Sequence, residues 1–121
     1  QTYTPEKTAE YEKLVRLRFQ NAGGVITDEP VRVEIAAFFA PPKSTRKRDK
    51  AEMLANRILP MKKPDVDNIA KIILDALNKI AYKDDSQVIE LSVKKIYSDA
   101  AKACVHIEEI DMRGDVDALA S

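Results

Sequence analysis

One segment, "DNIAKIILDALNKIA" at residues 67–81, constrains the fold of this chain more than any other. Its apolar residues recur at intervals of three and four, which places them on one face of an α-helix. These residues are Ile69, Ile72, Ile73, Ala76, Leu77 and Ile80. The pattern predicts a helix from Asp67 to about Ala81, whose apolar face must be buried against another layer of structure.

The rest of the sequence supplies that layer. A helix is predicted from Pro5 to Ala22, ended by two glycines, and a strand from Val31 to Ala40, where alternating β-branched residues stop at a Pro-Pro pair. A helix capped by Ser44 or Thr45 is predicted within residues 44–58. Strands are predicted at 86–97 and 102–110, and the short connection between them predicts an antiparallel pair. We expect one α/β (α+β) domain over residues 1–121, a mixed sheet covered by helices, with residues 111–121 as a polar tail.

Composition narrows the class of protein. The chain has 121 residues, the length of one domain, and no apolar run of the roughly 18 residues that would cross a bilayer. We therefore expect a soluble intracellular protein without a membrane partner. Its single cysteine, Cys104, allows no internal disulfide, and with His106 it supplies half a zinc site at best.

The formal net charge is zero, which gives no overall signature of nucleic-acid binding, yet the charges are unevenly distributed. Residues 43–63 contain only two acidic residues and eight basic ones: Lys43, Arg46, Lys47, Arg48, Lys50, Arg57, Lys62 and Lys63. Such a segment is either a solvated loop and helix or a surface that binds phosphates. If it binds DNA, we expect residues 43–57 to be mobile in the free protein and ordered on the DNA.

Acidic residues precede and open the isoleucine-rich helix. Asp65 and Asp67 stand two residues apart, and Asp67, Lys71 and Asp75 follow at intervals of four on the solvent side. One carboxylate would suffice as an N-cap, and Lys71 would then be only an ion-pair partner of Asp67. Two adjacent carboxylates repel each other, and a hard divalent cation such as Mg²⁺ relieves that repulsion.

A third ligand is available in "YKDDSQV", which contains Asp84 and Asp85 just before a predicted strand. Alone, this pair is typical of a turn. Asp85 is closer to the strand and thus better held, although residue types leave both open. Either carboxylate reaches the helix start only if the chain reverses. Lys71 would then place an ammonium group beside the metal, where it would either stabilise charge on a reacting phosphate or orient a water.

These segments resemble a known family. "KPDVDNIAKIILDAL" followed by "YKDDSQVIELSVKK" resembles the RusA family of Holliday-junction resolvases, and "TYTPEKTAEYE" resembles the family's first helix. The resemblance covers about Lys63 to Lys95 most closely. It also implies a strand ahead of the first helix, which this sequence lacks, and its "LPMKKP" segment has no counterpart of the aromatic residues with which some members open the junction.

The resemblance implies a cytoplasmic, nucleoid-associated bacterial or phage enzyme: a homodimer that cuts opposing strands of four-way junction DNA symmetrically and leaves 5′-phosphates. It implies Mg²⁺ as cofactor, with Mn²⁺ as its substitute. The residues it implies are the metal ligands Asp65, Asp67 and Asp85, the catalytic Lys71, and Asn68 as their support. Two alternatives remain: a non-catalytic DNA-binding module whose acids are caps and loop charges, and a metal-dependent nuclease of other branched DNA.

Overall fold

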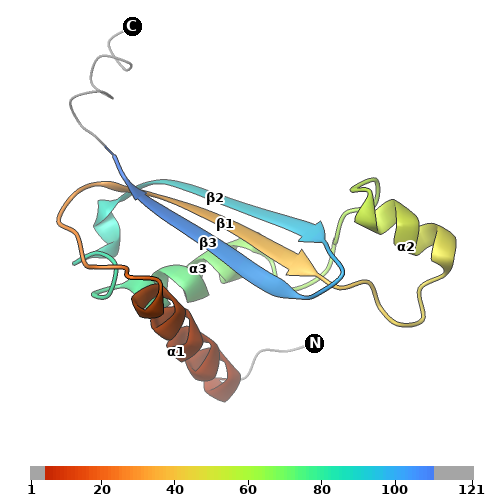
Figure 1. Cartoon of the computed structure of the whole chain (residues 1–121), viewed down its shortest axis with the longest axis horizontal. Helices are drawn as coiled ribbons and strands as arrows, with labels where there is room; N and C mark the ends of the chain where they lie inside the picture. Colours follow the sequence, from red (N-terminus) through yellow and green to blue (C-terminus); the bar gives the residue numbers. More distant parts are fainter. Residues whose placement is uncertain (1–4, 111–121) are drawn as a thin grey trace, which may run out of the picture.

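The computed structural model describes residues 5–110, with side chains from residue 9 onward, and has the expected α+β architecture (Figure 1). The predicted polar tail lies outside this range. The secondary-structure elements of the described chain are, in order, α1 (Pro5–Asn21), β1 (Val31–Phe39), α2 (Lys47–Leu54), α3 (Val66–Leu77), the 3₁₀ helix η1 (Asp85–Gln87), β2 (Val88–Tyr97) and β3 (Lys102–Glu109). No helix within 5–110 is long and apolar enough to cross a membrane.

The three strands form one mixed sheet in the order β2-β1-β3. β1 and β2 are parallel, and Val33 lies opposite Leu91. β1 and β3 are antiparallel, and Val33 lies opposite Ile107. The prediction that β2 and β3 pair with each other is therefore wrong, because β1 lies between them. β1 is the most apolar strand, and its helix-facing residues are buried (Val31, Val33, Ile35 and Ala37). The central position is the one that buries them most completely.

One face of this sheet is covered by helices (Figure 1). α3 lies against it and buries Ile69, Ile73 and Leu77 in the same cluster as the inner side chains of β1, and α1 packs on α3. α1 ends as predicted at the two glycines. Gly23 has a φ of 84°, and a Cβ on Gly24 would collide with the ring of Phe19.

The predicted end of the isoleucine-rich helix is wrong. α3 stops at Leu77, not Ala81, because Asn78 is extended and Lys79 has a φ of 67°. After this break, Tyr82 turns back into the core, where it is fully buried, and its hydroxyl donates to the carbonyl of Leu74 at 2.9 Å. An aromatic residue from beyond the helix thus occupies the space that the apolar periodicity assigned to a further helical turn.

Candidate active site

Asp65 and Asp67 occupy the start of α3 in a way that capping does not explain. Asp65 stands at the N-cap position with extended backbone angles, yet its side chain makes no capping hydrogen bond. Asp67, the predicted start of the helix, lies within its first turn. Both residues are exposed, and Lys63 Nζ lies 3.4 Å from Asp65 Oδ2. Two carboxylates are therefore present where the fold requires at most one.

The predicted ridge on the solvent side of α3 is confirmed, because Asp67, Lys71 and Asp75 are all exposed. Its ion pair differs from the expectation. Lys71 Nζ lies 3.2 Å from Asp75 Oδ2, one turn toward the C-terminus, and not beside Asp67. Asn68, the predicted support, is also exposed. An exposed pair of this kind is weak, so Lys71 can exchange Asp75 for another anion at little cost.

The second acidic pair is divided between two roles. Asp84 caps η1: its Oδ2 accepts from the backbone N–H of Ser86 at 2.9 Å, while Gln87 Oε1 accepts from the N–H of Asp84 at 3.0 Å. The hydrogen bonds from Ser86 hold the pKa of Asp84 below its ordinary value. Asp85, the first residue of η1, remains exposed. The D-x-x-Q spacing of a capping box was readable in the sequence and would have separated the two acids.

Asp85 lies at the opposite end of α3 from Asp65 and Asp67. Gln87 Nε2 donates to the carbonyls of Thr27 and Glu29, which fixes η1 where β1 begins. The loop before α3 lies instead where β1 and β2 end, because the Nζ of Lys62 sits over the rings of Phe39 and Tyr97, at 5.7 and 5.9 Å from their centroids. Strands of this length span about 30 Å.

The expected set of three carboxylates is therefore not assembled within one chain. Among residues 5–110, no three Asp, Glu, His or Cys side chains lie close enough together to hold a metal ion. The chain reverses directly after α3, so α3 and β2 run antiparallel. The turn that carries Asp85 therefore lies at the C-terminal end of the helix and not at its start.

The eight basic residues form two groups. Six belong to residues 43–57, here named the basic arm, which includes α2; this helix buries no side chain and projects beyond the end of the sheet (Figure 1). Its N-cap is Arg46, without a capping bond, and not the predicted Ser44 or Thr45. Two cations are paired, Arg46 with Asp49 at 3.4 Å and Arg57 with Glu52 at 2.9 Å.

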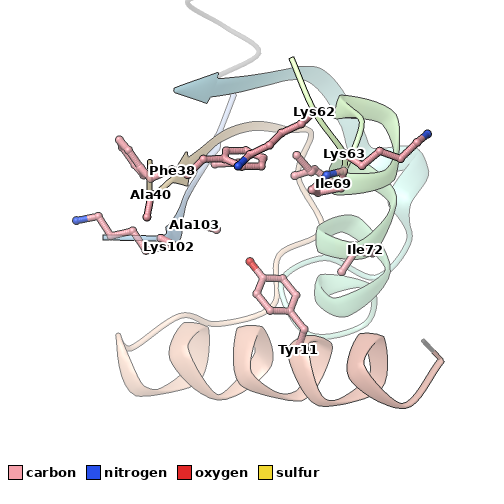
Figure 2. A pocket seen from close by; sticks show the side chains of 13 residues that line it. Tyr11, Phe38, Ala40, Lys62, Lys63, Ile69, Ile72, Lys102 and Ala103 are labelled. Carbon is pink, nitrogen blue, oxygen red and sulfur yellow. The ribbon is translucent and has the colours of Figure 1, made fainter. Parts of the chain in front are cut away.

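Lys62 and Lys63 form the second group, directly before the carboxylates. They border a cavity of about 820 Å³ between α1, α3 and the end of β1. Figure 2 shows Tyr11 rising from α1 into this space, Ile69 and Ile72 along α3, and Lys63 extending away from it. Lys62 also contacts Phe39 and Tyr97, which hold the loop in place. No local pattern around the loop pointed to these two aromatic residues, because both lie at strand ends far from the loop in the chain.

Comparison with known proteins gives a consistent result. The family model described as endodeoxyribonuclease RusA matches residues 1–108 of this chain. A relative from Bacillus subtilis (strain 168), described as "Uncharacterized protein YqaN", is 38% identical over 111 residues, which cover 88% of this chain and 77% of that protein. The family match spans both acidic pairs, the basic arm and almost the whole described sheet. The chain belongs to the RusA endodeoxyribonuclease family.

Proposed function

We propose that this chain is a divalent-metal-dependent endonuclease that resolves four-way DNA junctions and leaves 5′-phosphates, with Mg²⁺ as its metal and Mn²⁺ as a substitute. The observation that carries the proposal is the start of α3, where Asp65 and Asp67 are exposed and Asp65 makes no capping bond. Mg²⁺ is commonly held by one or two carboxylates together with waters and substrate phosphate. The donor set therefore fits this ion, and Asp65 and Asp67 would hold it.

The cations around this pair are suited to DNA. When bound, the metal supplies Lewis-acid chemistry for phosphodiester hydrolysis. Lys63 lies beside Asp65 and Lys62 precedes it in the same loop, and both would hold the DNA backbone near the carboxylates. Lys71 lies one turn beyond Asp67, and we assign its ammonium group to the charge that develops on the phosphate, once DNA draws it away from Asp75. The basic arm would contact a neighbouring DNA arm.

The third predicted ligand, Asp85, calls for a second chain. In one chain it lies at the far end of α3, and two symmetric cuts require two active sites related by a two-fold axis. We therefore propose a homodimer in which Asp85 of each chain completes the site that begins with the partner's Asp65 and Asp67. Sedimentation that shows only monomer at micromolar concentration, while junctions are still cut in pairs, would refute this part.

The decisive experiment compares Asp67→Asn with Asp75→Asn on a labelled synthetic four-way junction. Both variants remove one exposed negative charge from the same face of α3. We expect Asp67→Asn to reduce cleavage at least about 100-fold and to leave junction binding intact. Asp75→Asn should cut at close to the wild-type rate. EDTA should stop cleavage by the wild type, and linear duplex should not be cut.

Two other outcomes would point to other functions. Salt-sensitive junction binding without hydrolysis in any divalent metal would indicate a non-catalytic DNA-binding module, a possibility that the exposed basic arm favours. Metal-dependent cutting of flaps or forks at rates equal to those on four-way junctions would indicate a nuclease of broader selectivity. If Asp67→Asn cuts like the wild type, the assignment of the carboxylates is wrong.

A further inference from the structure

β2 is an edge strand whose outer side is open. Within residues 5–110 it pairs only with β1, and two of its large apolar side chains are largely exposed to solvent at this edge: Ile89 is 63% exposed and Leu91 44%. Long, apolar open edges invite pairing with another strand, and proteins usually cover or charge them. β2 has ten residues without a proline, and no helix lies over its outer edge in Figure 1. The edge is thus suited to accept another strand.

The two faces of β2 are assigned by its register with β1. Leu91 and Val93 lie opposite Val33 and Ile35, so they belong to the helix-covered face. The outer, helix-free face carries the residues opposite Arg32, Glu34 and Ala36 of β1, namely Glu90, Ser92 and Lys94. Glu90 contacts Arg32 on this face at 2.6 Å, whereas Lys94 has no charged partner within the described part of the chain. A strand that pairs here meets alternating charged and apolar positions.

The sequence of β2 is complementary to itself about Ser92. We infer that two copies of this chain associate through their β2 edges, antiparallel, with Ser92 facing Ser92 on the two-fold axis. Each Glu90 then lies opposite the partner's Lys94, and each Leu91 lies opposite the partner's Val93. Opposite charges and apolar pairs in these cross-strand positions are stabilising. The sheets of the two copies join into one, with α1 and α3 of both copies on the same face.

Neighbouring registers lack this match. A shift of the partner by two residues in one direction places Glu90 opposite the partner's Ser92, and a shift in the other direction places it opposite Ile96. A shift by one residue turns the partner over, so that its helices lie on the other face. The Ser92 register also places Ile89 opposite the partner's Lys95. That lysine donates to the carbonyl of Lys62, in the loop where Met61 is 96% exposed.

The significance of this interface rests on the proposed function, because the interface would bring proposed metal ligands of the two chains together. In antiparallel association, the beginning of β2 in one copy lies beside the end of β2 in the other. Asp85 precedes β2, and the loop that leads to Asp65 lies at the end of β2. The interface therefore brings the separated carboxylates toward each other twice, once at each end. Association through the opposite sheet edge, β3, would leave Asp85 remote from the partner's Asp65.

A cysteine placed on the axis tests the register directly. In a Cys104→Ser background, which removes the one native, exposed thiol, Ser92→Cys should form a covalent dimer under mild oxidation. Facing residues of antiparallel strands have Cα atoms about 5 Å apart, which a disulfide can span. Lys94→Cys in the same background is the matched control. Its two copies would lie about 14 Å apart, so it should not crosslink with itself.

Charge exchange tests the pairing without new covalent bonds. Lys94→Glu should weaken dimerisation about tenfold or more in analytical ultracentrifugation, because both charge pairs become repulsions. The double variant Glu90→Lys with Lys94→Glu should restore it. Lys102→Glu, on the outer face at the other edge of the sheet, should leave dimerisation unchanged. A Lys94→Glu protein that dimerises like the wild type, together with no Ser92→Cys crosslink, overturns the inference.

The outcomes separate this inference from the proposed function. A crosslinked dimer that cuts no DNA with any divalent metal supports the interface and contradicts the nuclease assignment. A dimeric, active enzyme that neither crosslinks at Ser92 nor responds to Lys94→Glu retains the nuclease assignment and refutes this interface. A protein that remains monomeric and still cuts junctions refutes the interface and the two-chain site together.

Discussion

The two ends of α3 carry similar pairs of acids and use them differently. Beyond its C-terminal end, three polar side chains stabilise the fold, whereas Asp85 remains exposed: the hydroxyl of Tyr82 donates to the carbonyl of Leu74, Asp84 caps η1, and Gln87 anchors η1 to the start of β1. At the N-terminal end, Asp65 occupies the cap position without a capping bond, and its neighbours Lys62 and Lys63 are exposed.

This difference gives a criterion for separating structural acids from functional ones. A carboxylate that accepts backbone N–H groups is explained by stability, since its loss leaves those donors unsatisfied. A carboxylate that stands in the same position without such bonds adds repulsion and contributes no capping bond. Asp65, which makes no capping bond, is thus assigned to DNA chemistry together with its exposed neighbour Asp67 and the exposed Asp85.

The largest expected effect is on catalysis by Asp65→Ala. Cleavage of a four-way junction should fall at least about 100-fold, because a proposed metal ligand is lost, while the melting temperature stays close to that of the wild type. Asp84→Ala at the other end should do the opposite, with cleavage within a few-fold of wild type and a lower melting temperature. Gel cleavage and thermal melts of the two purified variants make the comparison. Equal cleavage by both would remove the proposed distinction.

Much of the fold follows from the sequence because the residues that end its helices and strands are easy to recognise. Glycines end α1 and prolines end β1 within a residue of the predicted positions. The errors arise where tertiary contacts decide. Nothing local in β2 or β3 indicates that β1 separates them, since this depends on which strand is most apolar. The apolar period continues through Ile80, yet the burial of Tyr82 ends the helix at Leu77.

The candidate site was only partly predictable. The positions of Asp65 and Asp67 at a helix start follow from local pattern, and so does their exposure. The missing capping bond of Asp65 does not, because a cap residue and a ligand have the same sequence signature. The separation of Asp85 from the pair depends on the direction of α3 relative to β2, which no residue in the motif encodes. The third carboxylate of the site, Asp85, could therefore be named from the family resemblance, but its position relative to Asp65 and Asp67 could not be predicted.

The second prediction concerns the cations near the N-terminal end of α3. Replacement of Lys47, Arg48 and Lys50 in the basic arm by alanine should weaken junction binding and reduce the slope of log affinity against log salt by about 1 for each lost phosphate contact. Lys13→Ala, an exposed lysine on α1, is the control and should leave the slope unchanged. Fluorescence anisotropy across a salt series measures both. An unchanged slope in the triple variant would place the DNA elsewhere.

The third prediction concerns the C-terminal end. Tyr82→Phe removes the hydroxyl that donates to Leu74, and urea denaturation should show a loss of about 1 kcal/mol or slightly more. Burial, helped by the charges of Asp85 and Asp75, raises the pKa of Tyr82 above its ordinary value of about 10. The wild type should therefore lose stability as the pH rises above about 10, where the unfolded tyrosine ionises first. Tyr82→Phe should lack this contribution, and parallel curves for the two proteins would contradict the assignment.

The smallest expected effect is the pH dependence of the cap at Asp84. Ser86 holds the pKa of Asp84 below its ordinary value, through its side chain first and then its backbone N–H. A carboxylate with a lowered pKa in the folded state contributes stability above its unfolded pKa of about 4, and this contribution is lost as the pH falls through the folded value. Asp84→Asn should therefore lower the melting temperature at pH 7, and the difference from wild type should shrink below about pH 4. Asp65→Asn, which removes no capping bond, should change the melting temperature little at pH 7. If Asp65→Asn lowered the melting temperature as much as Asp84→Asn does, the acids at both ends of α3 would stabilise the fold.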